Sequence, residues 1–205
     1  MHILYFHQHF STPSGATGTR SYEMAKKLLS LGHQVTMVCG SYNVGATGLT
    51  NAFINGRREG DVEGIKVIEF DLSYANTDGF VIRSWQFIKF AYQSVKIALK
   101  ADYDLLFATS TPLTASIPGI FAKIFRRKKF VFEVRDLWPE LPKAMGVITN
   151  PLILWAMSVL EKVSYAQADG CIGLSPGIVE GIKRRSRKSL PVVLVPNGCD
   201  ISLFE

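Results

Sequence analysis

The first 40 residues hold a strand, a glycine-bearing loop, a helix and a second strand in direct succession. Residues 2–7 (HILYFH) and 34–39 (QVTMVC) are short apolar runs that are typical of buried strands. Between them, apolar residues recur at helical spacing over residues 19–31, and Gly32 follows where a helix C-cap would lie. A unit of this order and length predicts a βαβ crossover, whose two strands must run parallel.

The same alternation continues along the rest of the chain. We expect strands at residues 65–70, 104–109, 130–134, 170–174 and 192–195, and helices at 83–100, 113–126, 150–168 and from 175 into the basic run 183–188. Asn150-Pro151 is a typical helix start. Residues 40–64 lack periodicity and are expected to form a loop. This order predicts an α/β fold with a doubly wound, mostly parallel, Rossmann-like sheet and helices on both faces.

Composition favours one large globular domain. Of the 205 residues, 47% are hydrophobic and 20% are charged, which is ordinary for a chain with a sizeable core. Cys39, Cys171 and Cys199 are scattered along the chain, so neither a disulfide framework nor a zinc site is indicated, and we expect a reducing, cytoplasmic setting. We expect no signal peptide and no membrane-spanning helix, because the chain lacks an N-terminal basic region before an apolar run and has no apolar window of about 18 residues.

The formal net charge is +6, and basic residues gather in two runs, residues 126–129 and 183–188. Such runs can face water, an anionic membrane or nucleic acid. Only the charge supports nucleic acid, since the chain has no recognisable nucleic-acid-reading motif. We therefore expect no nucleic-acid partner and keep the anionic membrane surface open.

Charged residues follow the apolar strand 130–134 directly. Glu133, Arg135 and Asp136 lie around its carboxyl end, where open α/β sheets bind their ligands. Arg135 can clamp a phosphate, and Asp136 can orient a hydroxyl group or act as a base. The alternative is an Arg135–Asp136 ion pair that only fixes the loop.

A glycine loop follows the first strand and leads into the helix at 19–31. Gly15 and Gly18 would let the backbone approach a phosphate or a sugar oxygen at the helix N-terminus, or would serve only to turn the chain. The spacing is neither that of a dinucleotide-binding GxGxxG nor that of a P-loop. The second strand also ends at Cys39-Gly40 without an acidic residue for a ribose, so a dehydrogenase is disfavoured.

Histidine and serine residues lie at other strand ends. His7 and His9 point the same way in an extended chain, where they would line the ligand cleft or pack within the loop, and no third metal ligand is close. Ser110 and Ser175 each close a strand before a helix, so each would act as a helix cap or contact a ligand. Neither serine lies in a GxSxG elbow, which disfavours a serine hydrolase.

Several motifs in order resemble the N-terminal half of a GT-B glycosyltransferase of family 4, the glycosyltransferase group 1 type. The matching strings are GTRSYE at 18–23, GHQVT at 32–36, FEVRDLWPE at 132–140, ADGCI at 168–172, LSPG at 174–177 and VPNGCD at 195–200. The RDLWPE string resembles the WbuB-like amino-sugar transferases of bacterial surface-polysaccharide pathways.

The resemblance implies two Rossmann-like domains with the active site between them, and no metal or other cofactor. The N-terminal domain would bind the acceptor, and the C-terminal domain would bind most of the nucleotide-sugar donor. We expect residues 1–196 to form the acceptor-side domain and 197–205 to begin the crossover to a donor domain absent from this chain, which would be inactive alone. The enzyme would be a retaining transferase that moves a sugar from a nucleotide-sugar to a lipid-linked or saccharide acceptor. We expect the donor to be UDP-linked.

Site residues follow from the same comparison. Gly15 and Gly18 match the glycine loop near the donor phosphates, and many members have a histidine where this chain has Arg135. We expect Asp136 and Arg135 in catalysis, and expect the substrate-binding residues to be Gly15, Gly18, Thr19, Arg20, His9, Glu133, Ser110 and Ser175. The apolar helix 83–100 and the basic run at 126–129 are of the kind that attaches an enzyme peripherally to the inner face of the cytoplasmic membrane. The competing interpretation is a stand-alone nucleotide or sugar-phosphate binding module.

Overall fold

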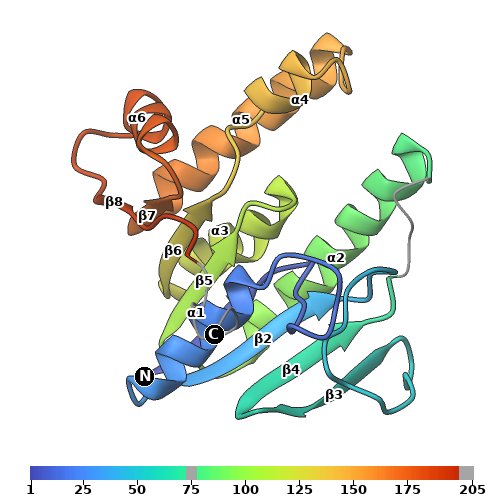
Figure 1. Cartoon of the computed structure of the whole chain (residues 1–205). Coiled ribbons are helices and arrows are strands. Elements are labelled where there is room, and N and C mark those ends of the chain that lie inside the picture. The colour runs from blue at the N-terminus through green and yellow to red at the C-terminus, as the bar shows by residue number, and fades with distance from the viewer. Residues whose placement is uncertain (73–77, 199–205) are drawn as a thin grey trace.

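The computed structural model describes residues 1–72 and 78–198 and contains a single eight-stranded sheet of order β3-β4-β2-β1-β5-β6-β7-β8 (Figure 1). The strands are β1 (His2–Phe6), β2 (Gln34–Gly40), β3 (Arg57–Val62), β4 (Ile65–Phe70), β5 (Leu105–Thr109), β6 (Lys129–Val134), β7 (Gly170–Gly173) and β8 (Val192–Leu194). Every neighbouring pair is parallel except β3–β4, which is antiparallel. The Rossmann-like α/β sheet predicted from the sequence is confirmed.

Helices connect the parallel strands. They are α1 (Arg20–Ser30), α2 (Phe80–Lys100), the 3-10 turn η1 (Leu113–Ser116), α3 (Ile117–Arg126), α4 (Glu140–Ala144), α5 (Pro151–Gln167) and α6 (Pro176–Arg185). The predicted cap of α5 is confirmed, since Asn150 Oδ1 accepts hydrogen bonds from Leu152 N and Ile153 N. Gly32 has a φ of +80°, the left-handed conformation that closes α1.

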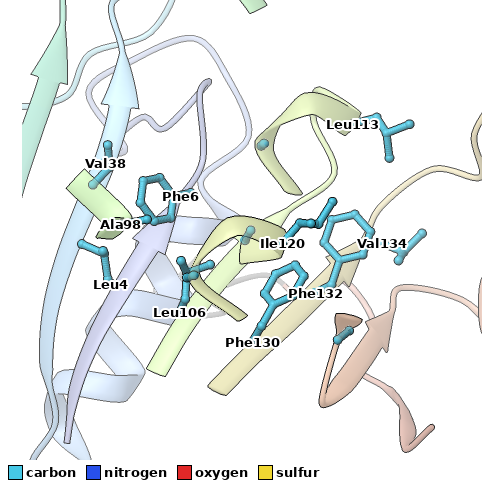
Figure 2. Close-up of a cluster of buried hydrophobic side chains, with 14 of the residues drawn as sticks. Leu4, Phe6, Val38, Ala98, Leu106, Leu113, Ile120, Phe130, Phe132 and Val134 are labelled. Carbon is cyan, nitrogen blue, oxygen red and sulfur yellow. The ribbon is translucent and has the colours of Figure 1, made fainter. Parts of the chain in front are cut away.

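The two faces of the sheet are covered unequally. On one face, Tyr22 and Ala25 of α1 pack in a cluster with Tyr5 and Met37. The opposite face holds the larger cluster, in which side chains from β1, β5 and β6 meet α2, η1 and α3; Figure 2 labels Leu4, Phe6, Val38, Ala98, Leu106, Leu113, Ile120, Phe130, Phe132 and Val134. Tyr165 of α5 and Ile182 of α6 belong to this second cluster. Within the described residues, the helices therefore crowd one face, and α1 covers the other.

Strand β3 corrects the expectation that residues 40–64 form a loop throughout. Arg57 to Val62 pair antiparallel with β4 through a turn in which Glu63 and Gly64 have positive φ. The strand lies at the edge of the sheet, and most of its side chains are at least partly exposed. A polar edge strand lacks the apolar alternation from which strands are predicted.

The order of parallel strands brings several strand ends together. β1, β5, β6 and β7 are adjacent and run in the same direction, so their carboxyl ends form one edge of the sheet. Helices α2 and α5 begin at this edge and project beyond it (Figure 1). At this edge the chain leaves each strand and turns into the helix that runs back. Open α/β sheets bind their ligands at such an edge.

A buried ion pair joins the helices beyond β6. Glu161 of α5 accepts a hydrogen bond from Arg185 Nη1 of α6 at 2.6 Å, and Arg185 Nη2 also reaches Glu140 of α4 at 2.5 Å. Tyr165 Oη donates to the same Glu161 at 2.9 Å, so the buried carboxylate is satisfied. Burial raises the pKa of Glu161, and these partners oppose that rise.

Two of the three cysteines and all the described helices bear on the expectations drawn from composition. Cys39 and Cys171 are buried free thiols, whereas Cys199 lies outside the described residues, as does most of the expected crossover at 197–205. None of the helices in the described part of the chain is both long enough and apolar enough to cross a membrane.

Candidate functional site

A polar cavity of about 350 Å³ opens at the carboxyl edge of the central strands. Its lining comes from the segments that follow β1, β2, β5, β6 and β7, from the glycine loop and from the segment after β8. The lining residues are His7, His9, Thr17, Gly18, Tyr42, Thr111, Arg135, Asp136, Leu174 and Asn197. Segments far apart in sequence thus supply one site, which we call the cleft.

Arg135 and Asp136 lie side by side in sequence in the cleft wall, and both are half-buried. They form no ion pair with each other in the described structure, so the alternative role as a loop-fixing pair is not realised. The backbone N–H of Arg135 donates to Ser110 Oγ at 2.9 Å, which fixes the start of this segment against the end of β5. Burial raises the pKa of Asp136, and the positive charge of Arg135 opposes that rise.

His7 presents one ring nitrogen to the cleft. Its Nδ1 forms a 2.7 Å hydrogen bond with Ser21 Oγ in the first turn of α1. Its Nε2 is buried and has no partner among the described residues, and the same holds for Thr17 Oγ1 and Thr111 Oγ1. Burial, Arg135 and His9 lower the pKa of His7, so the ring is neutral near pH 7. These three buried polar atoms around one cavity have hydrogen bonds left to form, which water or a polar ligand in the cavity can complete.

His9 forms the wall of the cleft next to α2. Its ring lies 5.0 Å from the ring of Tyr42 and 6.2 Å from the ring of Phe87, measured between centroids. Burial and the positive charges of Arg83 and Arg135 lower the pKa of His9 to about 4. The imidazole is therefore uncharged at neutral pH and can accept or donate a hydrogen bond without adding charge.

Glu133 and Arg20 form a buried pair beside the cleft. Arg20 Nε donates to Glu133 Oε1 at 2.9 Å, and Thr109 Oγ1 donates to Glu133 Oε2 at 2.9 Å. The same guanidinium donates to Val195 O at 2.8 Å and to Pro196 O at 2.7 Å. Glu133 is 1% exposed and does not line the cleft, so it holds Arg20, and Arg20 holds the segment that follows β8.

The remaining predicted residues are placed as follows. Gly18 lines the cleft, and a Cβ built there would lie 3.9 Å from Arg135 Nη2. Thr19 and Arg20 line an adjoining hollow of about 670 Å³ that also includes Gly18 and Arg135. Gly15 lies away from the cleft, where a Cβ would come within 2.1 Å of Ser11 Oγ.

The two serines differ in what they hold. Ser175 Oγ accepts a hydrogen bond from Ile178 N at 3.2 Å and so caps α6, which is the first of its two predicted roles. Ser110 is fully buried and caps no helix, because η1 and α3 begin later and Ser110 Oγ instead accepts from Arg135 N. Ser110 therefore supports a residue of the cleft lining, Arg135, whereas Ser175 holds the start of α6.

Sequence reasoning missed five of the cleft residues as substrate contacts, namely Thr17, Tyr42, Thr111, Leu174 and Asn197. Thr111 and Leu174 are the sequence neighbours of the predicted Ser110 and Ser175. The sequence therefore located these two strand ends correctly, but the residue that lines the cleft is one position away from the predicted one. Tyr42 comes from the segment after β2, which carried no pattern. Among the described residues, no three His, Cys, Asp or Glu side chains gather as a metal site.

A family model described as the glycosyl transferase 4-like domain matches residues 15–198. The chain belongs to this family. The match spans the glycine loop, the ends of β2, β5, β6 and β7, and the segment fastened by Arg20. No curated protein sequence matches the chain.

Solved structures share the fold of this glycosyl transferase 4-like domain. Sucrose-phosphate synthase from Thermosynechococcus elongatus superposes with a TM-score of 0.64 at 15% identity, over 98% of this chain and 49% of that one. The E. coli trehalose-6-phosphate structure bound with UDP-2-fluoro glucose superposes with a TM-score of 0.62 at 11% identity, over 99% of this chain and 50% of that one. Phytolacca americana UGT2, complexed with UDP-2-fluoro-glucose and pterostilbene, superposes with a TM-score of 0.53 at 12% identity, over 99% of this chain and 56% of that one. The chain spans about half the length of these proteins.

Proposed function

We propose that this domain is the acceptor side of a retaining glycosyltransferase that moves a sugar from a nucleotide-sugar to a lipid-linked or saccharide acceptor. The observation that carries the proposal is the cleft, which combines Arg135 and Asp136 with buried, unpartnered polar atoms on His7, Thr17 and Thr111. A sugar offers many hydroxyl groups, each able to donate and accept, which suits such a lining. Membership of the glycosyl transferase 4-like family supports the reaction class.

Each cleft residue has a distinct proposed role. Asp136 contacts a hydroxyl of the reacting sugars and orients it or accepts its proton. Arg135 faces the negative charge that develops on the departing phosphate, and Gly18 lets that group approach the start of α1. His9 contacts the acceptor as a neutral hydrogen-bonding group. Glu133, Ser110, Ser175 and Gly15 act on substrate only through the residues they hold in place.

The substrates are proposed from two kinds of support. UDP-linked donors are supported by two structures of the same fold, which were solved with UDP-2-fluoro glucose. The RDLWPE string supports an amino-sugar transferase of the WbuB-like group, acting in bacterial surface-polysaccharide synthesis. We place most of the nucleotide-sugar site on a second domain across the cleft, and the enzyme needs no metal or other cofactor.

The test is transfer by the full-length protein with Asp136→Asn. Turnover is measured with a panel of UDP-sugars and a lipid-diphosphate-linked sugar acceptor. We expect Asp136→Asn to lower kcat/KM on the order of 100-fold, the usual range for losing a positioned acid or base. Gly18→Val, whose side chain would stand beside Arg135, should also abolish most turnover. Asp102→Asn, an exposed carboxylate before β5, is the matched control and should keep wild-type rates. Full activity of both cleft variants would show that these roles are misassigned.

We further propose that the enzyme attaches peripherally to the anionic inner face of the cytoplasmic membrane. Helices α2, α3 and α5 lie on one face of the sheet and expose large apolar side chains, among them Trp85, Phe125 and Trp155. Lys89 lies over the ring of Trp85 at 5.7 Å, and exposed Arg127 and Lys129 follow α3. Apolar side chains ringed by cations are typical of interfacial binding.

Liposome flotation of the full-length protein tests this attachment. We expect binding to vesicles with anionic lipid, weaker binding to zwitterionic vesicles, and loss of binding in the double variant Trp85→Ser/Trp155→Ser. Ile54→Ser removes an exposed apolar side chain next to β3 and serves as the control. Absence of binding to anionic vesicles by the wild-type protein would refute the attachment while leaving the transferase assignment standing.

A further inference from the structure

A second hollow, lined mostly by apolar side chains, adjoins the cleft. It encloses about 260 Å³ between α2, η1, α4 and α5. The lining residues are Arg83, Ser84, Phe87, Ile88, Pro112, Leu113, Thr114, Trp138, Pro142, Val147, Ile148, Ile153, Met157 and Leu160. We call this hollow the apolar groove.

The apolar groove and the cleft have neighbouring wall residues at three points. Pro112 lines the groove directly after Thr111, which lines the cleft. Trp138 lines the groove two residues after Asp136 of the cleft. The ring of Phe87 in the groove lies 6.2 Å from the ring of His9 in the cleft. A ligand whose polar part occupies the cleft can therefore extend an apolar part into the groove.

Polar atoms in the groove wall lack partners. Arg83 Nε, Thr114 Oγ1 and Trp138 Nε1 are buried and form no hydrogen bond with any described residue. Arg83 is also in no ion pair of the described structure, and it lies one turn of α2 before Phe87, whose ring contacts His9 at the junction with the cleft. Each of these three groups can donate a hydrogen bond, and the guanidinium is positive, so together they favour an anion.

We propose that the apolar groove binds the first part of an aliphatic chain whose phosphate or diphosphate is held at Arg83, the acceptor sugar then lying in the cleft. This inference rests on the proposed transferase function and narrows its acceptor from a lipid-linked or free saccharide to a lipid phosphate. A free oligosaccharide fits poorly, because its hydroxyl groups would lose water without gaining partners along the apolar walls. Val81 and Leu152, exposed near the first turns of α2 and α5, extend the apolar surface for a longer chain.

The test measures binding to the full-length protein in the absence of any sugar donor. The probes are farnesyl diphosphate, farnesol and inorganic diphosphate, and isothermal titration calorimetry measures the affinity of each. We expect farnesyl diphosphate to bind at least about 10-fold more tightly than either half of it, because only the whole molecule fills the groove and meets Arg83.

Two variants locate the site, each with a matched control. Val147→Trp places a large side chain at the groove rim and should weaken farnesyl diphosphate binding about 10-fold, whereas Val193→Trp on β8 should not. The two valines are similarly exposed, at 59% and 56%. Arg83→Met should weaken farnesyl diphosphate about 10-fold and leave farnesol binding unchanged, whereas the exposed Arg184→Met on α6 should change neither.

Any of three results would overturn the inference: no binding of farnesyl diphosphate, inorganic diphosphate binding as tightly as farnesyl diphosphate, or wild-type affinity in both Val147→Trp and Arg83→Met. The proposed transferase function is judged separately by sugar transfer in Asp136→Asn. Transfer to a soluble saccharide with no farnesyl diphosphate binding would sink the groove assignment alone, and groove binding without transfer would sink the reaction alone.

Discussion

His9 is a residue on which burial and two arginine side chains act together. All three lower its pKa to about 4, so the folded protein holds the ring uncharged well below the pH at which a free histidine titrates, about 6.5. The unfolded chain takes up a proton as the pH falls through about 6.5, whereas the folded chain takes it up only near 4. Stability is therefore full above this window and is lost as the pH falls through it.

Replacement of His9 isolates this effect. We expect wild type to lose roughly 2 kcal/mol more unfolding free energy than His9→Gln between pH 7 and pH 5, since glutamine does not titrate. His7 is present in both proteins, and burial, the main cause of its lowered pKa, acts on it in both, so most of its contribution cancels. Urea unfolding at the two pH values measures the difference, and equal losses in the two proteins would show that His9 is accessible to protons in the folded state.

At the residue scale, sequence could predict the edge of the sheet but not which side chain faces the cleft. Successive residues at a strand end point to opposite sides, so the choice between Ser110 and Thr111 depends on register. The pairing of β5 with β6 turns Ser110 inward to Arg135 N and Thr111 toward the cleft. Asp136, Arg135 and His9 were predictable because their segments leave strands directly at the edge, and Gly18 because it lies in the glycine loop before α1.

At the element scale, α3 lies unusually close to β6. A Cβ built on Gly119 would lie 2.3 to 2.5 Å from ring atoms of Phe130, closer than carbon atoms can approach. Phe130 is fully buried in the larger core cluster and cannot swing out to solvent. A residue with poor helix propensity is thus required inside this helix by packing.

Gly119→Ala should therefore destabilise the protein despite the better helix propensity of alanine. We expect a loss of about 1 to 3 kcal/mol, the usual cost of overpacking a dense core. Gly177→Ala in the first turn of α6 is the control, because its nearest contact would be Ser175 Oγ at 4.0 Å, and it should be neutral or slightly stabilising. Thermal unfolding followed by circular dichroism compares the two, and similar melting temperatures would contradict the packing argument.

Elements with a strong apolar period were predictable, and those without one were not. The parallel strands are apolar because both of their faces are covered, which gives a clear signal. β3 reads RREGDV and is held at the sheet edge by its turn and by Arg58, whose guanidinium meets Glu69 of β4 at 2.9 Å. Such pairing depends on a partner strand and leaves no periodic trace in the sequence.

At the scale of the whole molecule, Arg20 fastens the end of the domain to its beginning. Its guanidinium donates hydrogen bonds to the carbonyl groups of Val195 and Pro196, and Glu133 neutralises its positive charge. The adjacent N–H of Val195 donates to Gly173 O at 3.0 Å. The segment after β8 thus borders the cleft in a fixed position, and Asn197 contributes to the cleft lining.

Arg20→Lys should loosen this segment while keeping the charge. Lysine cannot reproduce the fork of donors that reaches Glu133 and two carbonyl groups. We expect the amide of Val195 to exchange with solvent roughly 5-fold faster or more, at little cost to exchange elsewhere. Hydrogen exchange mass spectrometry measures this, with Arg57→Lys on β3 as the control. Unchanged exchange over residues 192–198 would show that β8 alone holds the segment.

The position of β1 in the sheet has a consequence for how the chain can be assembled during synthesis. β1 is made first and lies in the middle, with β2 on one side and β5 on the other. β2 and the β3–β4 hairpin extend the first side, and β5, β6, β7 and β8 then add to the other side in the order in which they are translated. Each parallel strand after β1 therefore finds its partner edge already made when it leaves the ribosome, and only the second edge of β1 waits for a distant segment, β5.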